Sequence, residues 1–350
     1  RVHTARGDLA GAIEVLRKLV EADPRRAPRY LQRMAEHAHA LYRDDEAVEY
    51  AAAAVARTPD DAEGHRRLGD LYRARQDMDR AIASYRRAIE LNERLFPTYF
   101  DLAEIHLARS EPAEADALYR AVLRLSPDDD LVARAGRASM QIHLGRGTLQ
   151  ELESDLLPLA LGHARRPIFR RLLVELYDSL ATTWIQQARG HGEEAEAARE
   201  ELARRGTRAI KPLLEALADS DPTQQRIAID VLGHLGNENA AGPLLAAAES
   251  QEAPLELRAR ALSGAGAVAP SSMAPRFAAL AAGPERRLRD VAAWSLARMG
   301  GARALAALRD LAGQGDPAVR AYAALGLGRA EDRRSLDRLE QLLREDRSPQ

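Results

Sequence analysis

The stretch "GHRRLGDLYRARQDMDRAIASYRRAIELNE", residues 64–93, decides the fold of this 350-residue chain. It contains two apolar patterns with helical spacing, separated by the polar residues of "RARQDMD". Its small and large packing residues are Leu68, Gly69, Tyr72, Ala81, Tyr85 and Ala88. The pattern predicts two antiparallel helices in which Gly69 lets the second helix approach closely at Ala81, while Tyr85 fills the remaining gap.

The same pattern recurs at a distance of 34 residues in both directions. The later copy contains Leu102, Ala103, His106, Ala115, Tyr119, Val122 and Pro127; the earlier copy contains Met34, Ala35, Ala38, Ala47, Ala51, Ala54 and Pro59. Pro59 and Pro127 are expected to end the second helix of their copies. Residues 7–24 fit only the second half of a copy, so we expect a missing or vestigial first helix and a chain cut from something longer. A degenerate fourth copy is expected over about 130–160.

These residues and their spacing resemble the tetratricopeptide repeat (TPR), which implies stacked helix pairs. On this resemblance residues 1–160 form a TPR array, with a truncated first unit and a degenerate fourth. A connecting helical segment follows at 161–191. Pro167 is expected to start a long helix that ends near Gly190, and Trp184 is expected to cap the last TPR unit.

A second period of about 31 residues organises the rest of the chain. One column of small residues contains Gly233, Gly266, Ala297 and Gly328, and a second column contains Pro212, Pro243, Pro275, Ala306 and Asp337. The pattern resembles HEAT-like repeats of the short type first described in phycobilisome lyases. It implies five helix pairs and a HEAT-like array over 192–350. The predicted fold is therefore all-α, an α-solenoid of stacked antiparallel helix pairs, TPR first and HEAT-like second.

The segment "LSGAGAVAP", residues 262–270, offers an alternative interpretation. Gly264, Gly266 and Ala269 have the spacing of a dinucleotide-binding loop, but such a loop follows a β-strand and no strand is predicted here. We therefore predict that Gly266 and Gly328 are helix-packing positions.

A row of polar residues recurs in the same frame: Gln225, Arg258, Arg289 and Arg320. The HEAT-like resemblance implies a structural role, in which each arginine bonds to an acidic residue of the preceding turn, such as Asp316.

Charge and composition restrict the possible partners. The formal net charge is −2, with 30 basic and 34 acidic residues up to position 200 and 21 basic and 19 acidic residues after it. Neither half has the basic excess of a nucleic-acid binder. Cysteine is absent, and no apolar run approaches the length of a membrane span. Because the chain starts at Arg1 with no visible signal peptide, the compartment stays open, with the cytoplasm slightly favoured.

No catalytic, metal or cofactor site is predicted. The nine histidines do not form H-E-x-x-H, and the chain lacks G-x-S-x-G and the P-loop motif. We therefore expect a non-enzymatic adaptor that binds peptide segments or protein partners in concave grooves. Two alternatives remain by analogy with HEAT-like families, namely an enzyme subunit of the lyase type and a nucleic-acid binder. The oligomeric state stays open.

The candidate partner-binding residues follow from the TPR resemblance. They are Glu36, Arg66, Asp70, Arg73, Phe100, Glu104 and Leu107. Three of them, Glu36, Asp70 and Glu104, occupy the position that faces the concave surface, one per repeat, and are expected to form a line of negative charge. Arg66 and Arg73 are expected to neutralise part of it, and Phe100 and Leu107 to add apolar surface. The predicted partner is a protein segment with basic and apolar side chains; the alternative is a merely solvated surface.

Overall fold

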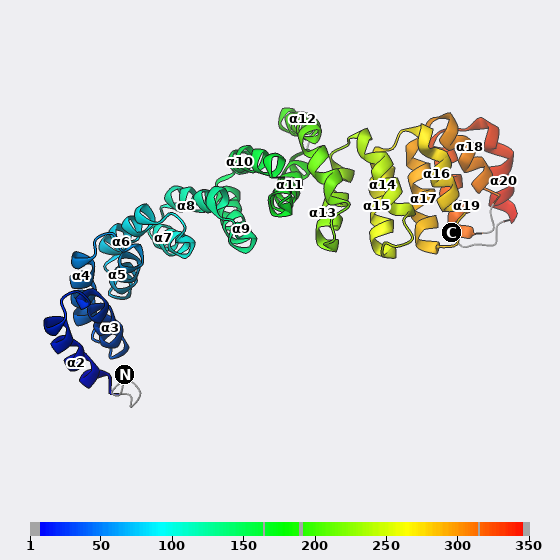
Figure 1. The fold of residues 1–350 in the computed structure, drawn as a ribbon. Helices are drawn as coiled ribbons and strands as arrows, with labels where there is room; N and C mark the ends of the chain where they lie inside the picture. Colours follow the sequence, from blue (N-terminus) through cyan, green and yellow to red (C-terminus); the bar gives the residue numbers. More distant parts are fainter. Residues whose placement is uncertain (1–7, 164, 189–191, 314–315, 346–350) are drawn as a thin grey trace. The chain divides into compact units, whose positions relative to one another are not determined.

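The computed structural model describes residues 8–163, 165–188, 192–313 and 316–345. Within these ranges the regular structure is helical and contains no β-strand. The chain divides into two compact units, which are described separately: the first unit, Arg1–Thr148, and the second unit, Leu149–Gln350. The prediction of an all-α fold of stacked antiparallel helix pairs is confirmed (Figure 1).

The first unit is a series of helices joined by short turns. They are α2 (Leu9–Ala22), α3 (Ala27–Ala40), α4 (Asp44–Arg57), α5 (Ala62–Ala74), α6 (Met78–Leu91), α7 (Phe96–Ala108), α8 (Pro112–Leu125) and α9 (Asp129–Arg146). Each helix packs against the next along the chain. The pairs α3/α4, α5/α6 and α7/α8 reproduce the predicted repeats. The single helix α2 corresponds to the half-repeat expected before them.

The turn inside each of these pairs has the same backbone conformation. Tyr42, Gln76 and Ser110, spaced 34 residues apart, have positive φ angles of 59°, 61° and 61°. After each of them an N–H donates back into the preceding helix, as from Asp77 to the carbonyl of Tyr72 at 2.9 Å. This is a helix C-cap that glycine usually provides. Because no glycine marks these positions, the sequence pattern did not reveal them.

The helices of the first unit pack through a small residue against a large one. A Cβ at Gly69 would lie 2.6 Å from the ring of Tyr85, so only glycine allows this approach. Tyr85 is buried, and its hydroxyl donates to Oδ1 of Asp70 at 2.7 Å. In the next repeat Ala103 and Tyr119 are both buried. The predicted role of Gly69 and Tyr85 is confirmed.

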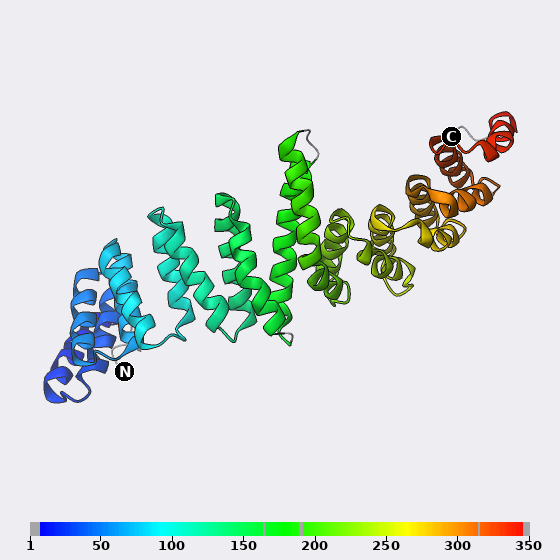
Figure 2. The same ribbon diagram turned by 90° about the horizontal axis from the view of Figure 1, so that it is seen from above.

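The second unit contains longer and more variable helices. They are α10 (Leu149–Gly162), α11 (Pro167–Ala188), α12 (Glu193–Ala216), α13 (Pro222–His234), η1 (Glu238–Ala240), α14 (Ala241–Glu249), α15 (Leu255–Val268), η2 (Ser271–Met273), α16 (Ala274–Ala281), α17 (Arg286–Met299), α18 (Gly301–Leu311), α19 (Pro317–Arg329), η3 (Arg333–Ser335) and α20 (Leu336–Glu345). The predicted helix from Pro167 is α11. It packs against α12 and α13, and Figure 2 shows α11 and α12 in green, side by side. The side chain of Trp184 lies outside the described residues.

Five helix pairs run from α11/α12 to α19/α20 in the described part of the second unit. The number agrees with the prediction, but α11 is a member of the stack as well as a connection. The helices α11, α13, α15, α17 and α19 form one layer in which each contacts the next. The boundaries 1–160, 161–191 and 192–350 remain sequence-based predictions.

The layer is held together by contacts between small residues. A Cβ at Gly233 would lie 2.9 Å from Cα of Gly264, and a Cβ at Gly266 would lie 2.6 Å from Cβ of Ser295. Both Gly264 and Gly266 lie inside α15, so they do not form a nucleotide-binding loop. The packing role predicted for Gly266 is confirmed.

The packing role predicted for Gly328 is wrong, because a Cβ there would meet no atom within 4 Å. In α19 the packing glycine is Gly326, where a Cβ would lie 2.7 Å from Cα of Ala297. In α13, α15 and α17 the column residue faces the following helix of the layer. It meets that helix two residues before the column residue there, as Gly233 meets Gly264 and not Gly266. Gly328 belongs to the last helix of the layer that the structure describes, so it has no helix to face.

The polar row caps the preceding helix or turn. Gln225 donates to the carbonyls of Leu217 and Asp219, and Arg258 donates to that of Ala248 at 3.0 Å. Arg289 donates to the carbonyls of Gly283 and Pro284. Cationic and amide donors satisfy carbonyls that a helix end leaves free. At Gln225, Arg258 and Arg289, backbone carbonyls therefore take the place of the acidic partner expected in the preceding turn. Arg289 also binds Asp316, at 2.9 Å, in the following turn.

Candidate functional site

A pocket of about 280 Å³ lies between α3, α4 and α5 of the first unit. Its floor is apolar and consists of Ala35, Ala51, Ala54, Val55 and Leu71. Each of these residues is nearly buried, because the helices that carry them pack around the pocket. The pocket has room for one apolar side chain from outside.

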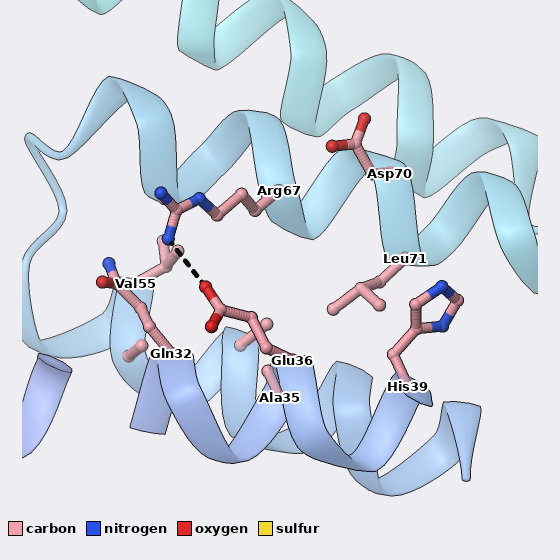
Figure 3. Close-up of a pocket in the computed structure, with 11 residues that line it drawn as sticks. Gln32, Ala35, Glu36, His39, Val55, Arg67, Asp70 and Leu71 are labelled. Atoms are coloured by element: carbon pink, nitrogen blue, oxygen red, sulfur yellow. Dashed lines mark hydrogen bonds and ion pairs between the residues drawn. The ribbon is translucent and has the colours of Figure 1, made fainter. Parts of the chain in front are cut away.

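Polar side chains surround the mouth of this pocket. They are Gln32, Glu36 and His39 from α3, with Arg67 and Asp70 from α5. Figure 3 shows Glu36 and Arg67 reaching toward each other from the two helices, where an Arg67 guanidinium nitrogen lies 3.3 Å from Oε1 of Glu36. Gln32 donates to Asp61 at 2.8 Å, which ties α3 to the turn before α5. The floor is therefore apolar and the rim is charged.

The three residues of the predicted acidic column, Glu36, Asp70 and Glu104, have half-exposed side chains. Each one is paired with arginine. Glu36 pairs with Arg67, Asp70 with Arg66 at 2.9 Å, and Glu104 with Arg73 at 3.1 Å. Arginines of the same and neighbouring helices therefore reach every member of the predicted line of negative charge. Arg66 and Arg73 do neutralise part of the column, as predicted.

Burial and hydrogen bonds change the protonation behaviour of this surface. The guanidinium of Arg66 lowers the pKa of Glu63, to which it donates at 2.6 and 2.9 Å. Burial, and then the Asp70 carboxylate, raise the pKa of Tyr85 far above its usual value, so its hydroxyl stays a donor. The same two causes raise the pKa of Asp101. Asp101 nevertheless accepts a hydrogen bond from Arg73 at 3.2 Å.

Phe100 is not the exposed apolar surface that was predicted beside Glu104. It is buried, with its ring 5.7 Å from the ring of Tyr119 and covered by the guanidinium of Arg134 at 4.1 Å. Leu107 is 41% exposed, as expected. The structure does not bring Phe100 or Leu107 into the pocket, which lies one repeat earlier. The sequence pattern marks Ala35, Ala51 and Ala54 as repeat positions, but it did not predict that they form the floor of a pocket.

Another polar cluster lies in the core between α8 and α9. Asp116, Ser139 and His143 are buried there, and both Ser139 and His143 bond to the Asp116 carboxylate. The other ring nitrogen of His143 lies 2.8 Å from Oγ1 of Thr148. Since neither nitrogen of His143 bonds to the serine hydroxyl, the set lacks the base-to-nucleophile contact of a hydrolase. It holds the two helices together.

The described residues include no group of three or more histidine and carboxylate side chains placed to hold a metal ion. Among the helices that the structure describes, none is long and apolar enough to cross a membrane.

Two models of repeat families match parts of the chain. Residues 69–110 match the model of the TPR repeat, and residues 273–350 match that of HEAT repeats. The chain therefore contains TPR and HEAT repeats. No curated protein matches it.

Several solved repeat structures are similar to the chain. A crystal structure of MamA is 19% identical, with a TM-score of 0.37, over 52% of this chain and 94% of that one. A TPR protein from Parabacteroides merdae is 15% identical, with a TM-score of 0.36, over 76% of this chain and 89% of that one. A chain in the structure of Naa15/Naa10 bound to HypK-THB is 14% identical, with a TM-score of 0.37, over 94% of this chain and 60% of that one.

Proposed function

We propose that this repeat scaffold is a non-enzymatic adaptor, and that a groove of its first unit, called the TPR unit from here on, holds an extended segment of a partner protein. The pocket between α3, α4 and α5 supports this proposal. An apolar floor with a charged rim suits one apolar anchor residue flanked by polar groups. Burying one such side chain contributes about 1.5–3 kcal/mol, enough to fix the register of an extended segment.

The charged side chains of the groove should give only a weak preference for the charge of the partner segment. The groove network consists of five carboxylates, Glu36, Glu63, Asp70, Asp101 and Glu104, and four guanidinium groups, Arg66, Arg67, Arg73 and Arg134. A small negative excess favours a basic residue next to the apolar anchor. A cation of the partner would compete with Arg67 for Glu36, whose side chain is 55% exposed. Electrostatics would therefore affect association rate and specificity more than affinity.

The test compares binding of short peptides with a central leucine or phenylalanine, flanked by lysine or by glutamate. We expect the full chain to prefer the lysine-flanked peptides. Ala35→Leu fills the pocket from its floor and should weaken binding by about tenfold or more, since one buried apolar side chain is displaced. Gln32→Trp should have the same effect by covering the mouth, without changing a buried residue.

The charge contribution is tested by the triple variant Glu36→Gln, Asp70→Asn, Glu104→Gln. It should remove the preference for lysine while binding of the apolar anchor remains. The matched control is Asp45→Asn, Asp60→Asn, Asp79→Asn, which removes three acidic side chains that are each more than four-fifths exposed. Unchanged binding in both Ala35→Leu and Gln32→Trp, with an unchanged melting temperature, would rule out the pocket as the anchor site.

A further inference from the structure

The second unit, Leu149–Gln350, is called the HEAT unit here, and two of its exposed large apolar side chains lie on neighbouring helices of the layer. Trp294 of α17 is 37% exposed and Leu325 of α19 is 51% exposed. They occupy equivalent positions 31 residues apart. Trp294 lies one turn before Ala297, and Leu325 is next to Gly326. Because Ala297 and Gly326 form a close contact between these two helices, the two exposed side chains flank that contact on the surface.

Two arginines recur on the same face, one turn later. Arg298 and Arg329 are exposed residues in the last turns of α17 and α19. The Arg298 guanidinium lies 4.5 Å from the centroid of a Trp294 ring. Neither arginine has a carboxylate within ion-pair distance in the part of the chain that the structure describes. Their positive charges are therefore available to a partner.

This lack of a carboxylate partner distinguishes them from four other arginines of the unit. Arg171, Arg276, Arg289 and Arg309 each form a close ion pair with a carboxylate. The neighbouring helix α15 adds only the small exposed residues Ser263 and Ala267 in the corresponding positions. Asp290 lies two turns before Arg298, and one of its carboxylate oxygens is buried. In the part of the chain that the structure describes, no ion pair compensates the positive charge next to Trp294 and Leu325.

Access to this surface is open. A Cβ at Gly328, the residue before Arg329, would meet no atom within 4 Å, so a partner backbone can approach the end of α19 closely. Indole and guanidinium groups are also the side chains that contribute most to binding at protein interfaces. A carboxylate can accept two parallel hydrogen bonds from one guanidinium, which gives direction as well as affinity.

We propose that the face formed by Trp294, Arg298, Leu325 and Arg329 binds a protein segment that carries acidic residues next to apolar ones. The apolar residue packs on Trp294 and Leu325, and the carboxylates bind Arg298 and Arg329. The preferred charge is opposite to that of the segment proposed for the TPR groove. The two repeat units would therefore hold two different segments.

The test uses the fluorescence of Trp294. The chain contains two tryptophans, so Trp184→Phe leaves Trp294 as the single reporter. The probes are short peptides without tryptophan, in which glutamate flanks leucine, phenylalanine or a pair of apolar residues. Peptides with lysine in place of glutamate are the controls. We expect a saturable blue shift of the emission with at least one glutamate-flanked peptide, weakened by added salt, and none with the lysine-flanked peptides.

Arg298→Gln, Arg329→Gln should weaken this binding by about tenfold or more. The matched control is Arg303→Gln, Arg333→Gln, which removes two exposed arginines elsewhere in the same unit and should leave binding unchanged. The proposal is overturned if no glutamate-flanked peptide gives a saturable shift, or if the control variant loses binding equally. Tighter binding of a single-stranded oligothymidylate than of every acidic peptide would also overturn it, in favour of a nucleic-acid surface.

Discussion

Helices approach each other closely in both the TPR unit and the HEAT unit, but different kinds of residue make the contact. In the TPR unit a glycine faces an aromatic ring, as Gly69 faces Tyr85. In the HEAT unit small residues face each other, as Gly233 faces Gly264 and Ala297 faces Gly326. The composition follows this division, since seven of the nine tyrosines precede residue 149. Loss of volume should therefore harm the TPR unit, and gain of volume should harm the HEAT unit.

The largest expected effect is on the TPR side. Tyr85→Ala removes a ring that is 1% exposed and should lower the free energy of unfolding by about 3–5 kcal/mol, because the surrounding helices cannot close the cavity. Tyr85→Phe keeps the ring, loses the bond to Asp70 and should cost about 1 kcal/mol. Amide hydrogen exchange should show the loss in α5 and α6. Equal costs of the two variants would show that the hydroxyl, and not the ring, carries the stability.

The second effect concerns charge in the HEAT unit. The buried carboxylate of Asp219 accepts hydrogen bonds from Arg171 at 2.7 and 3.2 Å and from Arg170 at 3.0 Å. The bonds from Arg171 contribute most to holding the pKa of Asp219 far below its usual value. Asp219→Asn should cost about 1.5–3 kcal/mol at neutral pH, since charged hydrogen bonds are lost.

The pH dependence of this effect has a defined sign. Because the pKa of Asp219 is lower in the folded state, its stabilisation is complete above about pH 4, the usual value for the unfolded chain, and is lost as the pH falls through the folded-state value. Asp101 of the TPR unit should act in the opposite direction, since burial raises its pKa and protonation relieves the cost of its charge. Hydrogen exchange at descending pH should show the HEAT unit weakening around α11 to α13, and less so in Asp219→Asn. Identical pH profiles for Asp219→Asn and the parent would contradict this account.

The smallest of the three effects tests the direction in which the small-residue column faces. Gly266→Leu places a side chain against Ser295 and should cost roughly 1–3 kcal/mol through overpacking. Gly328→Leu has the same chemistry in open space and should change stability by less than about 0.5 kcal/mol. Urea unfolding of both variants measures the difference. Equal costs would show that Gly328 is a packing position after all.

The repeats themselves were predictable from the sequence. The proline and aspartate residues at helix ends act within one helix. Small residues such as Gly69 and Gly266 act between a helix and either the next helix or the equivalent helix of the next repeat. Their spacing in the sequence therefore reports helix pairs and their number. The turn conformation at Tyr42, Gln76 and Ser110 was not predictable in this way, because these residues rarely adopt a positive φ and share no residue type that would mark the turn in the sequence.

The candidate site was predictable only in part. The sequence placed Glu36, Asp70 and Glu104 on one face, and the structure agrees that they are half exposed. Their pairing with arginine, the burial of Phe100 under Arg134 and the pocket below Glu36 became visible only in the structure.

The sequence by itself determined that this chain is built from helix pairs of two periods, because a period of apolar and small residues is a property of each repeat. Tertiary structure decided which neighbour each residue meets. Arg67 meets Glu36 across 31 positions, and Arg73 meets Glu104 across 31 positions, through distances that the packing of adjacent helices sets. Gly328 shares its column with Gly266 but lies in the last layer helix that the structure describes, so the same residue type packs in one place and is open in the other.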